Sequence, residues 1–229
     1  MVDELSGLEA VLFDLDGTLI DSEGLWWIAE CRVMDLLEGD WTPADQHHCL
    51  GGPLDRVASY MVNKTRTDRT VADVGDLLMA AMAELMVEQP LQWRPGAAEL
   101  LRACQDQDIS TGLVSATYRQ LIHAVSDVVA HETGGRGFDV SVAGDEVTDG
   151  KPHPEPYLTA ADRLGVDIAQ CVVIEDSPTG VAAGRASGAL VLAVPHMVAI
   201  EPGPRLIVRD SLEGVTPADL ARWLAAAER

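Results

Sequence analysis

Short apolar runs and longer stretches of helical periodicity alternate along much of this chain. The short runs hold four to six residues, too few for a helix, and they are bounded by turn residues or charges. Such runs are typical of strands buried on both faces of a parallel sheet. A further short run at 206–208 is a candidate sixth strand. The strands that we predict lie at residues 10–13, 109–114, 138–143, 171–174 and 190–194.

Between these runs, apolar residues recur three and four positions apart, which indicates amphipathic helices. Strands that alternate with helices predict an α/β fold, a doubly wound parallel sheet with right-handed crossovers. The helix following residues 171–174 carries small residues that allow close packing on a sheet. The helices that we predict in this part of the chain lie at 96–107, 119–130, 154–164, 177–187 and 217–227.

One long stretch, residues 24–89, breaks the alternation because it contains helical patterns and no convincing strand. The expected helices are 24–39, one starting near Pro43, 54–62 and 71–88. We therefore predict two domains. The α/β core comprises residues 1–21 and 91–229, and an inserted all-helical cap comprises residues 22–90.

Composition excludes several classes of partner. The chain has 229 residues, 47% of them hydrophobic, and a formal charge of −21, which argues against nucleic acid and anionic membranes. No apolar run reaches the roughly 18 residues of a membrane span, and the N-terminal residues do not resemble a signal peptide. The four cysteines lack zinc-site spacing. We expect reduced thiols in a cytoplasmic, monomeric protein.

Charged residues follow the first predicted strand directly. Asp14 and Asp16 come right after residues 10–13, and Gly17 allows a sharp turn behind them. Burying unpaired charges costs several kcal/mol, so we place both acids at the strand's carboxyl end, where open α/β sheets bind ligands. A loop or helix-capping role for the pair is the alternative interpretation.

Three other predicted strands are followed by residues of matching chemistry. Ser115 follows the second strand, Glu175 and Asp176 follow the fourth, and Lys151, one of only two lysines, comes after the third. In a parallel sheet these ends share one edge. Clustered carboxylates suit Mg²⁺, a carboxylate can act as a nucleophile, and a hydroxyl and an ammonium group can hold phosphoryl oxygens. The set indicates metal-assisted phosphoryl transfer.

Four segments carry a resemblance to a known family: DLDGTLIDSE (14–23), LVSAT (113–117), DGKPHPEPY (149–157) and VIEDSPTGVAAGRASG (173–188). In this order they resemble the haloacid dehalogenase (HAD) superfamily of phosphotransferases, across essentially the whole chain. The helical insert after the first segment is similar to the subfamily with a C1 cap, which includes β-phosphoglucomutases and small sugar phosphatases. The resemblance implies a Rossmann-like core and a Mg²⁺-dependent phosphatase that acts on a small phosphomonoester.

The same resemblance implies individual roles. Asp14 would be the nucleophile and a metal ligand, and Asp16 the general acid and base, with its backbone carbonyl on the metal. Asp176 would be a metal ligand, and Glu175 a second ligand or an orienting residue. The phosphoryl group would be held by Thr18, Ser115, the backbone N–H of Ala116 and Lys151, which would also contact Asp14.

Substrate specificity is expected from the cap. The candidates are Trp26, Gly51, Gly52 and Arg56, with a surface salt bridge as the alternative for the arginine. The resemblance to β-phosphoglucomutase implies that this chain has Trp26 at the position where that enzyme has a catalytic histidine in the cap hinge. The absence of this histidine favours hydrolysis over the alternative, a sugar-phosphate mutase.

Rival classes fit the sequence less well. A dehalogenase or a phosphonatase would lack the second acid, Asp16, although Lys64 lies in the cap where a phosphonatase carries a Schiff-base lysine. A phospho-receiver module also gathers acids, a hydroxyl and a lysine at strand ends, but in another order and without a long helical insert. The six histidines show no metal-ligand spacing. We interpret them as core or surface residues, with His153 a candidate for the rim of the site.

Overall fold

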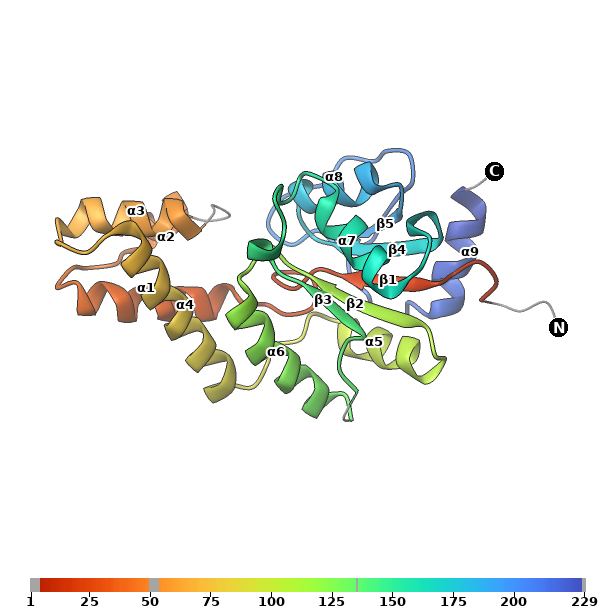
Figure 1. Ribbon diagram of the computed structural model, residues 1–229, viewed down its shortest axis with the longest axis horizontal. Coiled ribbons are helices and arrows are strands. Elements are labelled where there is room, and N and C mark those ends of the chain that lie inside the picture. The colour runs from red at the N-terminus through yellow and green to blue at the C-terminus, as the bar shows by residue number, and fades with distance from the viewer. Residues whose placement is uncertain (1–4, 50–53, 135, 228–229) are drawn as a thin grey trace. The chain divides into compact units, whose positions relative to one another are not determined.

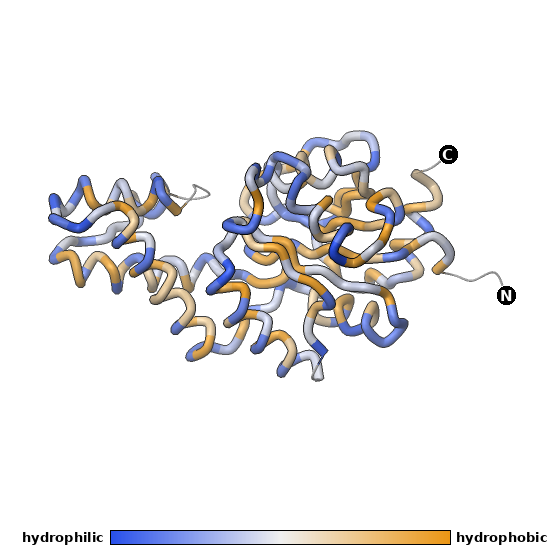
Figure 2. The backbone as a smooth tube through the Cα atoms, viewed as in Figure 1, coloured by the Kyte–Doolittle hydropathy of each residue, from blue (hydrophilic) through white to orange (hydrophobic). Residues whose placement is uncertain are grey.

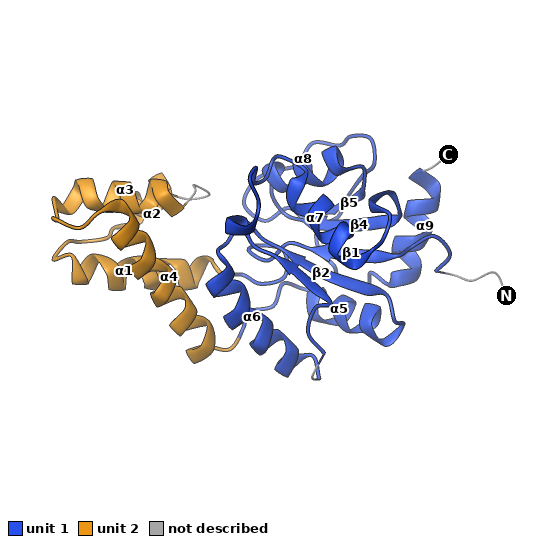
Figure 3. Ribbon diagram, viewed as in Figure 1, with its two compact units in different colours: residues 1–21, 91–229 blue, residues 22–90 orange. Residues whose placement is uncertain are grey.

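The computed structural model describes residues 5–49, 54–134 and 136–227. The chain forms two compact units (Figure 3). Unit 1 comprises Met1–Asp21 and Leu91–Arg229, and unit 2 comprises Ser22–Pro90.

Unit 1 is built on a six-stranded sheet in which every neighbouring pair is parallel (Figure 1). The strand order is β3-β2-β1-β4-β5-β6. The fold class predicted from the sequence is confirmed, and the sixth strand is present. The strands are β1 (Ala10–Phe13), β2 (Ser110–Val114), β3 (Val140–Val142), β4 (Cys171–Glu175), β5 (Leu190–Ala193) and β6 (Leu206–Val208).

Helices cover both faces of this sheet, as a doubly wound fold requires. Helices α7 (Glu155–Leu164) and α8 (Pro178–Ser187) pack together on one face, and α5 (Ala97–Asp106) and α9 (Pro217–Ala227) meet on the other. Helix α6 (Arg119–Glu132) connects β2 to β3, and short 3₁₀ turns occur at Gly144–Glu146 and Ile168–Gln170. Within unit 1, the predicted helices and strands differ from the observed ones by no more than two residues at each end.

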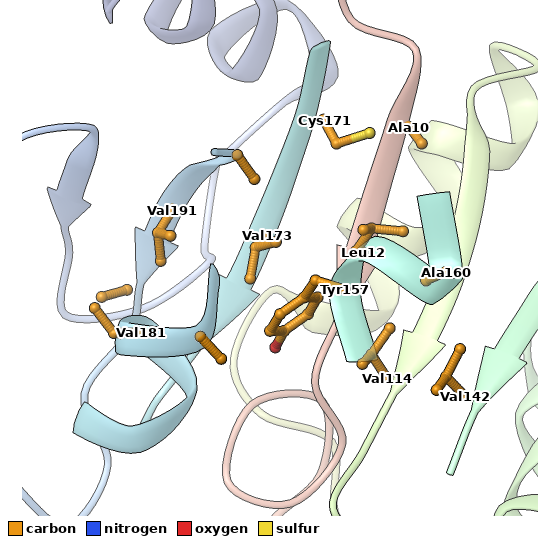
Figure 4. Packing of buried hydrophobic residues seen from close by; sticks show 13 residues of the cluster. Ala10, Leu12, Val114, Val142, Tyr157, Ala160, Cys171, Val173, Val181 and Val191 are labelled. Atoms are coloured by element: carbon orange, nitrogen blue, oxygen red, sulfur yellow. The ribbon is translucent and has the colours of Figure 1, made fainter. Parts of the chain in front are cut away.

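The core of unit 1 lies between the sheet and these helices. The central strands β1, β4 and β5 are buried at every residue, which explains why all of their residues except Glu175, the last of β4, are apolar (Figure 2). One cluster joins Leu12, Val114 and Val173 to Tyr157 of α7 (Figure 4). Tyr157 brings a polar hydroxyl into this otherwise apolar cluster, so that oxygen needs a hydrogen-bond partner.

Unit 2 contains four helices among its described residues, in agreement with the helical periodicity of this stretch. Thr70 and Asp73 form a reciprocal capping box at the start of the last one, which fixes where it begins. A buried carboxylate, Glu30, accepts a hydrogen bond from Trp41 Nε1 at 2.9 Å. The helices are α1 (Glu23–Leu36), α2 (Pro43–Cys49), α3 (Leu54–Thr65) and α4 (Val71–Glu88).

Across the described residues, no helix has the length and apolar character needed to cross a membrane. The four cysteines are free thiols, as predicted, and Cys49, Cys104 and Cys171 are buried.

Candidate active site

The carboxyl ends of β1, β2 and β4 meet at one edge of the sheet. The register pairs Phe13 with Leu113 on one side and with Ile174 on the other. The next residue along, Asp14, is held at this level because its backbone N–H donates to the Ile174 carbonyl at 3.0 Å. Strand pairing therefore brings together acids separated by about 160 positions in sequence.

Lys151 lies at the centre of this edge and makes three hydrogen bonds. Its Nζ is 2.7 Å from Asp14 Oδ1, 2.7 Å from Glu175 Oε1 and 2.9 Å from the Val114 carbonyl. An ammonium group has three donors, so all three are used here. Burial alone would lower the pKa of Lys151, but the two carboxylates raise it well above its ordinary value. Lys151 is therefore a fixed cation.

The acids at this edge outnumber the single ammonium group. Carboxylate oxygens of Asp14, Glu175 and Asp176 lie within 4.8 Å of one another, and all three residues are buried. Burial and the charge of Glu175 raise the pKa of Asp14 well above its ordinary value, and the same two causes raise the pKa of Asp176 to about 7. A set of hard oxygen donors with surplus negative charge fits a divalent cation such as Mg²⁺.

Glu175 is the most heavily hydrogen-bonded member of the set. Its Oε1 accepts from Lys151 and from the Tyr157 hydroxyl, the latter at 2.7 Å. Its Oε2 accepts from the Ser177 hydroxyl at 3.1 Å and from the backbone N–H groups of Asp176 and Ser177. These donors hold Glu175 in one orientation, which favours the orienting role that the sequence analysis left open beside direct ligation.

Two glycines leave room for the acids. Gly17 has a φ of +85°, and a Cβ built on it would lie 2.4 Å from Asp176 Oδ2. A Cβ on Gly180, in the first turn of α8, would lie 1.7 Å from Glu175 Oε1. Real Cβ atoms do not approach that closely, so a side chain at either position would displace a carboxylate. The close approach of Gly180 to Glu175 was not predicted from the sequence.

Asp16 has different neighbours from Asp14. Its Oδ2 accepts from the Thr117 hydroxyl at 3.2 Å and from the Ser115 hydroxyl at 3.5 Å. It is half-buried, and its side chain is not part of the three-acid cluster. The two acids of the first motif are thus held apart, one against Lys151 and the other against the loop after β2.

The predicted phosphate ligands are placed as follows. Ser115 is buried and Ala116 is exposed, both at the carboxyl end of β2. Thr18 is buried with its hydroxyl 3.4 Å from Asp176 Oδ1, so its observed partner is an acid of the cluster. The N-cap of α8 is Ser177, whose hydroxyl oxygen accepts from the Gly180 N–H at 3.1 Å.

The residues proposed for specificity lie in unit 2. Gly51 and Gly52 fall outside the described residues. Trp26 is a half-buried residue of α1, and the Arg56 guanidinium donates to the His48 carbonyl. Lys64 pairs with Asp45 at 2.6 Å, and this hydrogen bond raises the pKa of the lysine. A charged, ion-paired amine is unsuited to Schiff-base chemistry, which argues against a phosphonatase.

Three residues near the site were missed from sequence. In the sequence analysis, Tyr157 and Thr117 were named only as members of the quoted segments, and neither was given a role in the site. A tyrosine on the core face of a helix could have indicated a buried hydroxyl that needs a hydrogen-bond partner. His196, interpreted as an ordinary core or surface residue, follows β5 at the same edge of the sheet. Its Nε2 lies 3.9 Å from Asp21 Oδ2, and its Nδ1 lies 3.3 Å from a Cβ built on Gly17. His153, the candidate for the rim of the site, is half exposed and contacts Glu155, two residues further along the chain.

The chain is similar to known proteins over most of its length. A family model described as haloacid dehalogenase-like hydrolase matches residues 8–188. Hexitol phosphatase B of Escherichia coli strain K12 is 32% identical over 217 residues, which cover 92% of this chain and 96% of that protein. The phosphorylated carbohydrates phosphatase of Thermotoga maritima is 29% identical and covers 95% of this chain and 98% of its own length.

A solved structure is similar over nearly the whole chain. CbbY from Rhodobacter sphaeroides, crystallised in complex with phosphate, superposes with a TM-score of 0.80 at 26% identity. The match covers 93% of this chain and 99% of that one.

Proposed function

Because the chain belongs to the haloacid dehalogenase-like hydrolases, we propose that it is a phosphatase that removes phosphate from a small phosphorylated metabolite, most simply a sugar or sugar-alcohol phosphate. The observation that carries the proposal is the buried contact between Asp14 and Lys151 at the sheet edge, with Asp16 held separately by two hydroxyls. The names of the two phosphatase relatives support the substrate class.

In the first proposed step, an Asp14 carboxylate oxygen attacks the phosphorus and an aspartyl-phosphate forms. The bond from phosphorus to the leaving oxygen breaks, and Asp16 gives that oxygen a proton. Lys151 balances charge on the phosphoryl group and on Asp14, from which its Nζ is 2.7 Å away. Ser115, the Ala116 N–H and Thr18 are the proposed hydrogen-bond donors to the remaining phosphoryl oxygens.

The second proposed step restores the enzyme. Asp16 takes a proton from water as the water oxygen attacks the phosphorus, and the bond between phosphorus and the Asp14 oxygen breaks. Inorganic phosphate and the free Asp14 carboxylate result. Asp14 and Asp176, the backbone carbonyl of Asp16, and Glu175 directly or as an orienting group, are the residues that would hold Mg²⁺. When bound, this cation would neutralise charge shared by the carboxylates and the phosphoryl oxygens.

Phosphate release tests the proposal. We expect purified protein with Mg²⁺ to release phosphate from p-nitrophenyl phosphate and from members of a sugar-phosphate panel. D14N should lower kcat by about 10³-fold or more, because the nucleophile is lost while the size of the side chain is kept. A D14N variant that keeps most of its turnover would exclude the aspartyl-phosphate route.

The mutase alternative predicts a different product. If the protein converts β-glucose 1-phosphate to glucose 6-phosphate without releasing phosphate, it is a mutase and not a phosphatase. We propose that Trp26 contributes to the preference for hydrolysis.

We also propose that the working protein is a monomer. Size-exclusion chromatography with light scattering would check its oligomeric state.

A further inference from the structure

Thr117 lies two residues beyond Ser115, in the loop that follows β2. Its backbone is fixed without any use of its side chain. The Thr117 N–H donates to Ser115 Oγ at 3.0 Å, and the Thr117 carbonyl accepts from the Gly144 N–H at 2.8 Å. The loop is also tightly packed, since a Cβ built on Gly144 would lie 2.1 Å from the Ala116 carbonyl oxygen. The Thr117 hydroxyl is therefore presented from a rigid backbone.

That hydroxyl contacts a carboxylate 101 positions away in sequence. Thr117 Oγ1 donates to Asp16 Oδ2 at 3.2 Å, and Ser115 Oγ lies 3.5 Å from the same oxygen, at the outer limit of a hydrogen bond. Ser115 has a competing task in the proposed reaction, because its hydroxyl would turn to the phosphoryl group. Thr117 supplies the contact to Asp16 that can persist when substrate is bound.

We propose that Thr117 is a positioning residue for Asp16, an inference that rests on the proposed function. With Oδ2 accepting from the Thr117 hydroxyl, the carboxyl plane is fixed and the proton that Asp16 gives and takes is carried on Oδ1. Fixed orientation matters because proton transfer requires the acid within hydrogen-bond reach of the leaving oxygen. Thr117 does not itself touch the reacting atoms.

The position of the hydroxyl predicts which substrates depend on it. An alkoxide is a poor leaving group and needs a proton during bond cleavage, whereas p-nitrophenolate leaves without one. The ratio kcat/KM reports the steps up to the first phosphoryl transfer, in which Asp16 acts as the acid. Loss of the Thr117 hydroxyl should therefore lower kcat/KM for an alkyl phosphate and spare that for p-nitrophenyl phosphate.

The test compares T117V, which keeps the shape of the side chain, T117A, which is a second way to remove the hydroxyl, and T117S, which keeps it. The two probes are p-nitrophenyl phosphate and the faster of sorbitol 6-phosphate and glucose 6-phosphate. We expect T117V and T117A to lose about tenfold or more in kcat/KM on the alkyl phosphate and about twofold or less on p-nitrophenyl phosphate, because general acid catalysis contributes about 10²–10⁴-fold. T117S should stay within about threefold of wild type on both.

S115A provides a contrast, since a lost phosphoryl contact should slow both substrates alike. Any of three outcomes would overturn the proposal. T117V and T117A could lose equally on both substrates, they could keep unchanged rates on the alkyl phosphate, or T117S could be as impaired as T117V. Wild-type protein that hydrolyses neither probe would instead reject the proposed phosphatase function, and the role of Thr117 with it.

Discussion

Lys151 Nζ and Asp14 Oδ1 lie 2.7 Å apart, and both side chains are almost entirely buried. The lysine is 137 positions away in sequence and reaches the acid from the loop before α7. Its other donors go to Glu175 and to the Val114 carbonyl, so it joins the ends of three strands. The lysine is thus both a catalytic candidate and a structural link.

Removal of this cation should affect activity and stability together. K151M leaves Asp14 and Glu175 buried without their shared partner, and loss of one partner from a buried ion pair typically costs about 3–5 kcal/mol. We expect a lower urea midpoint, and phosphatase turnover reduced by about 10²-fold or more in the fraction that remains folded. Circular dichroism and phosphate release measure the two effects.

The chain has only one other lysine, Lys64, so the control for K151M is K64M in unit 2. Lys64 pairs with Asp45 but belongs to the other compact unit. K64M should lower stability with little change in kcat. Equal losses of kcat in the two variants would contradict a specific role for Lys151.

Gly180 should not tolerate even one methyl group. G180A places a Cβ 1.7 Å from Glu175 Oε1, so the carboxylate must move away from Lys151 and Tyr157. We expect a loss of about 2–4 kcal/mol in the free energy of unfolding, because overpacking is combined with broken buried hydrogen bonds. Activity should fall in parallel.

The matched control is G75A, inside helix α4. A Cβ on Gly75 would meet only Leu54 Cδ2, at an ordinary 3.8 Å, and alanine is the better helix former by about 0.5–1 kcal/mol. G75A should therefore be neutral or stabilising in denaturant unfolding. A G180A variant as stable and active as G75A would show that Glu175 does not need its observed position.

Cation binding should be visible without catalysis. Mg²⁺ that binds only the folded state stabilises it by RT ln(1 + [Mg²⁺]/Kd), so the melting temperature rises once the concentration exceeds the dissociation constant. We expect such a rise for the wild-type protein and its near-complete loss in D176N. Because burial and Glu175 raise the pKa of Asp176 to about 7, D176N should also be more stable than wild type at pH 8 without Mg²⁺.

E155Q is the control for adventitious binding of Mg²⁺. Asp149, His153 and Glu155 form a second, more exposed group of possible ligands in unit 1. Each oxygen of the Glu155 carboxylate also accepts a hydrogen bond from a backbone N–H group. The single amide oxygen of a glutamine can keep one of these two hydrogen bonds. If E155Q abolishes the rise in melting temperature and D176N does not, the cation binds at the exposed group instead.

Glu30 should make the stability of unit 2 depend on pH. Burial raises the pKa of this carboxyl from 4.5 to about 7, although the hydrogen bond from Trp41 opposes the shift. The folded state therefore holds its proton more tightly than the unfolded state, and stability falls as pH rises from about 4.5 to 7. E30Q keeps an oxygen acceptor for Trp41 and removes the charge.

We expect E30Q to be more stable than wild type by about 1–3 kcal/mol at pH 8 and nearly equal to it at pH 4.5. Urea unfolding at the two pH values, followed by tryptophan fluorescence, measures the difference. A gain of the same size at both pH values would mean that the ionisation of Glu30 is not its cause.

The sequence by itself determined the alternation of strands and helices, and with it the parallel sheet. Apolar runs on β1, β4 and β5 have no polar face, so only a sheet covered on both sides accommodates them. Because parallel strands end at one edge, the same pattern also indicated that Asp14 and Glu175 would be neighbours. Local periodicity and strand direction suffice for that inference.

Only the tertiary structure decided which atoms meet. Periodicity places Tyr157 on the buried face of α7 but cannot direct its hydroxyl to Glu175, because that contact depends on how the helix sits on the sheet. The division of partners between Asp14 and Asp16 likewise depends on Lys151 and Thr117, each more than 100 positions away. Contacts between distant segments are set by the packing of the whole unit, which local sequence patterns do not specify.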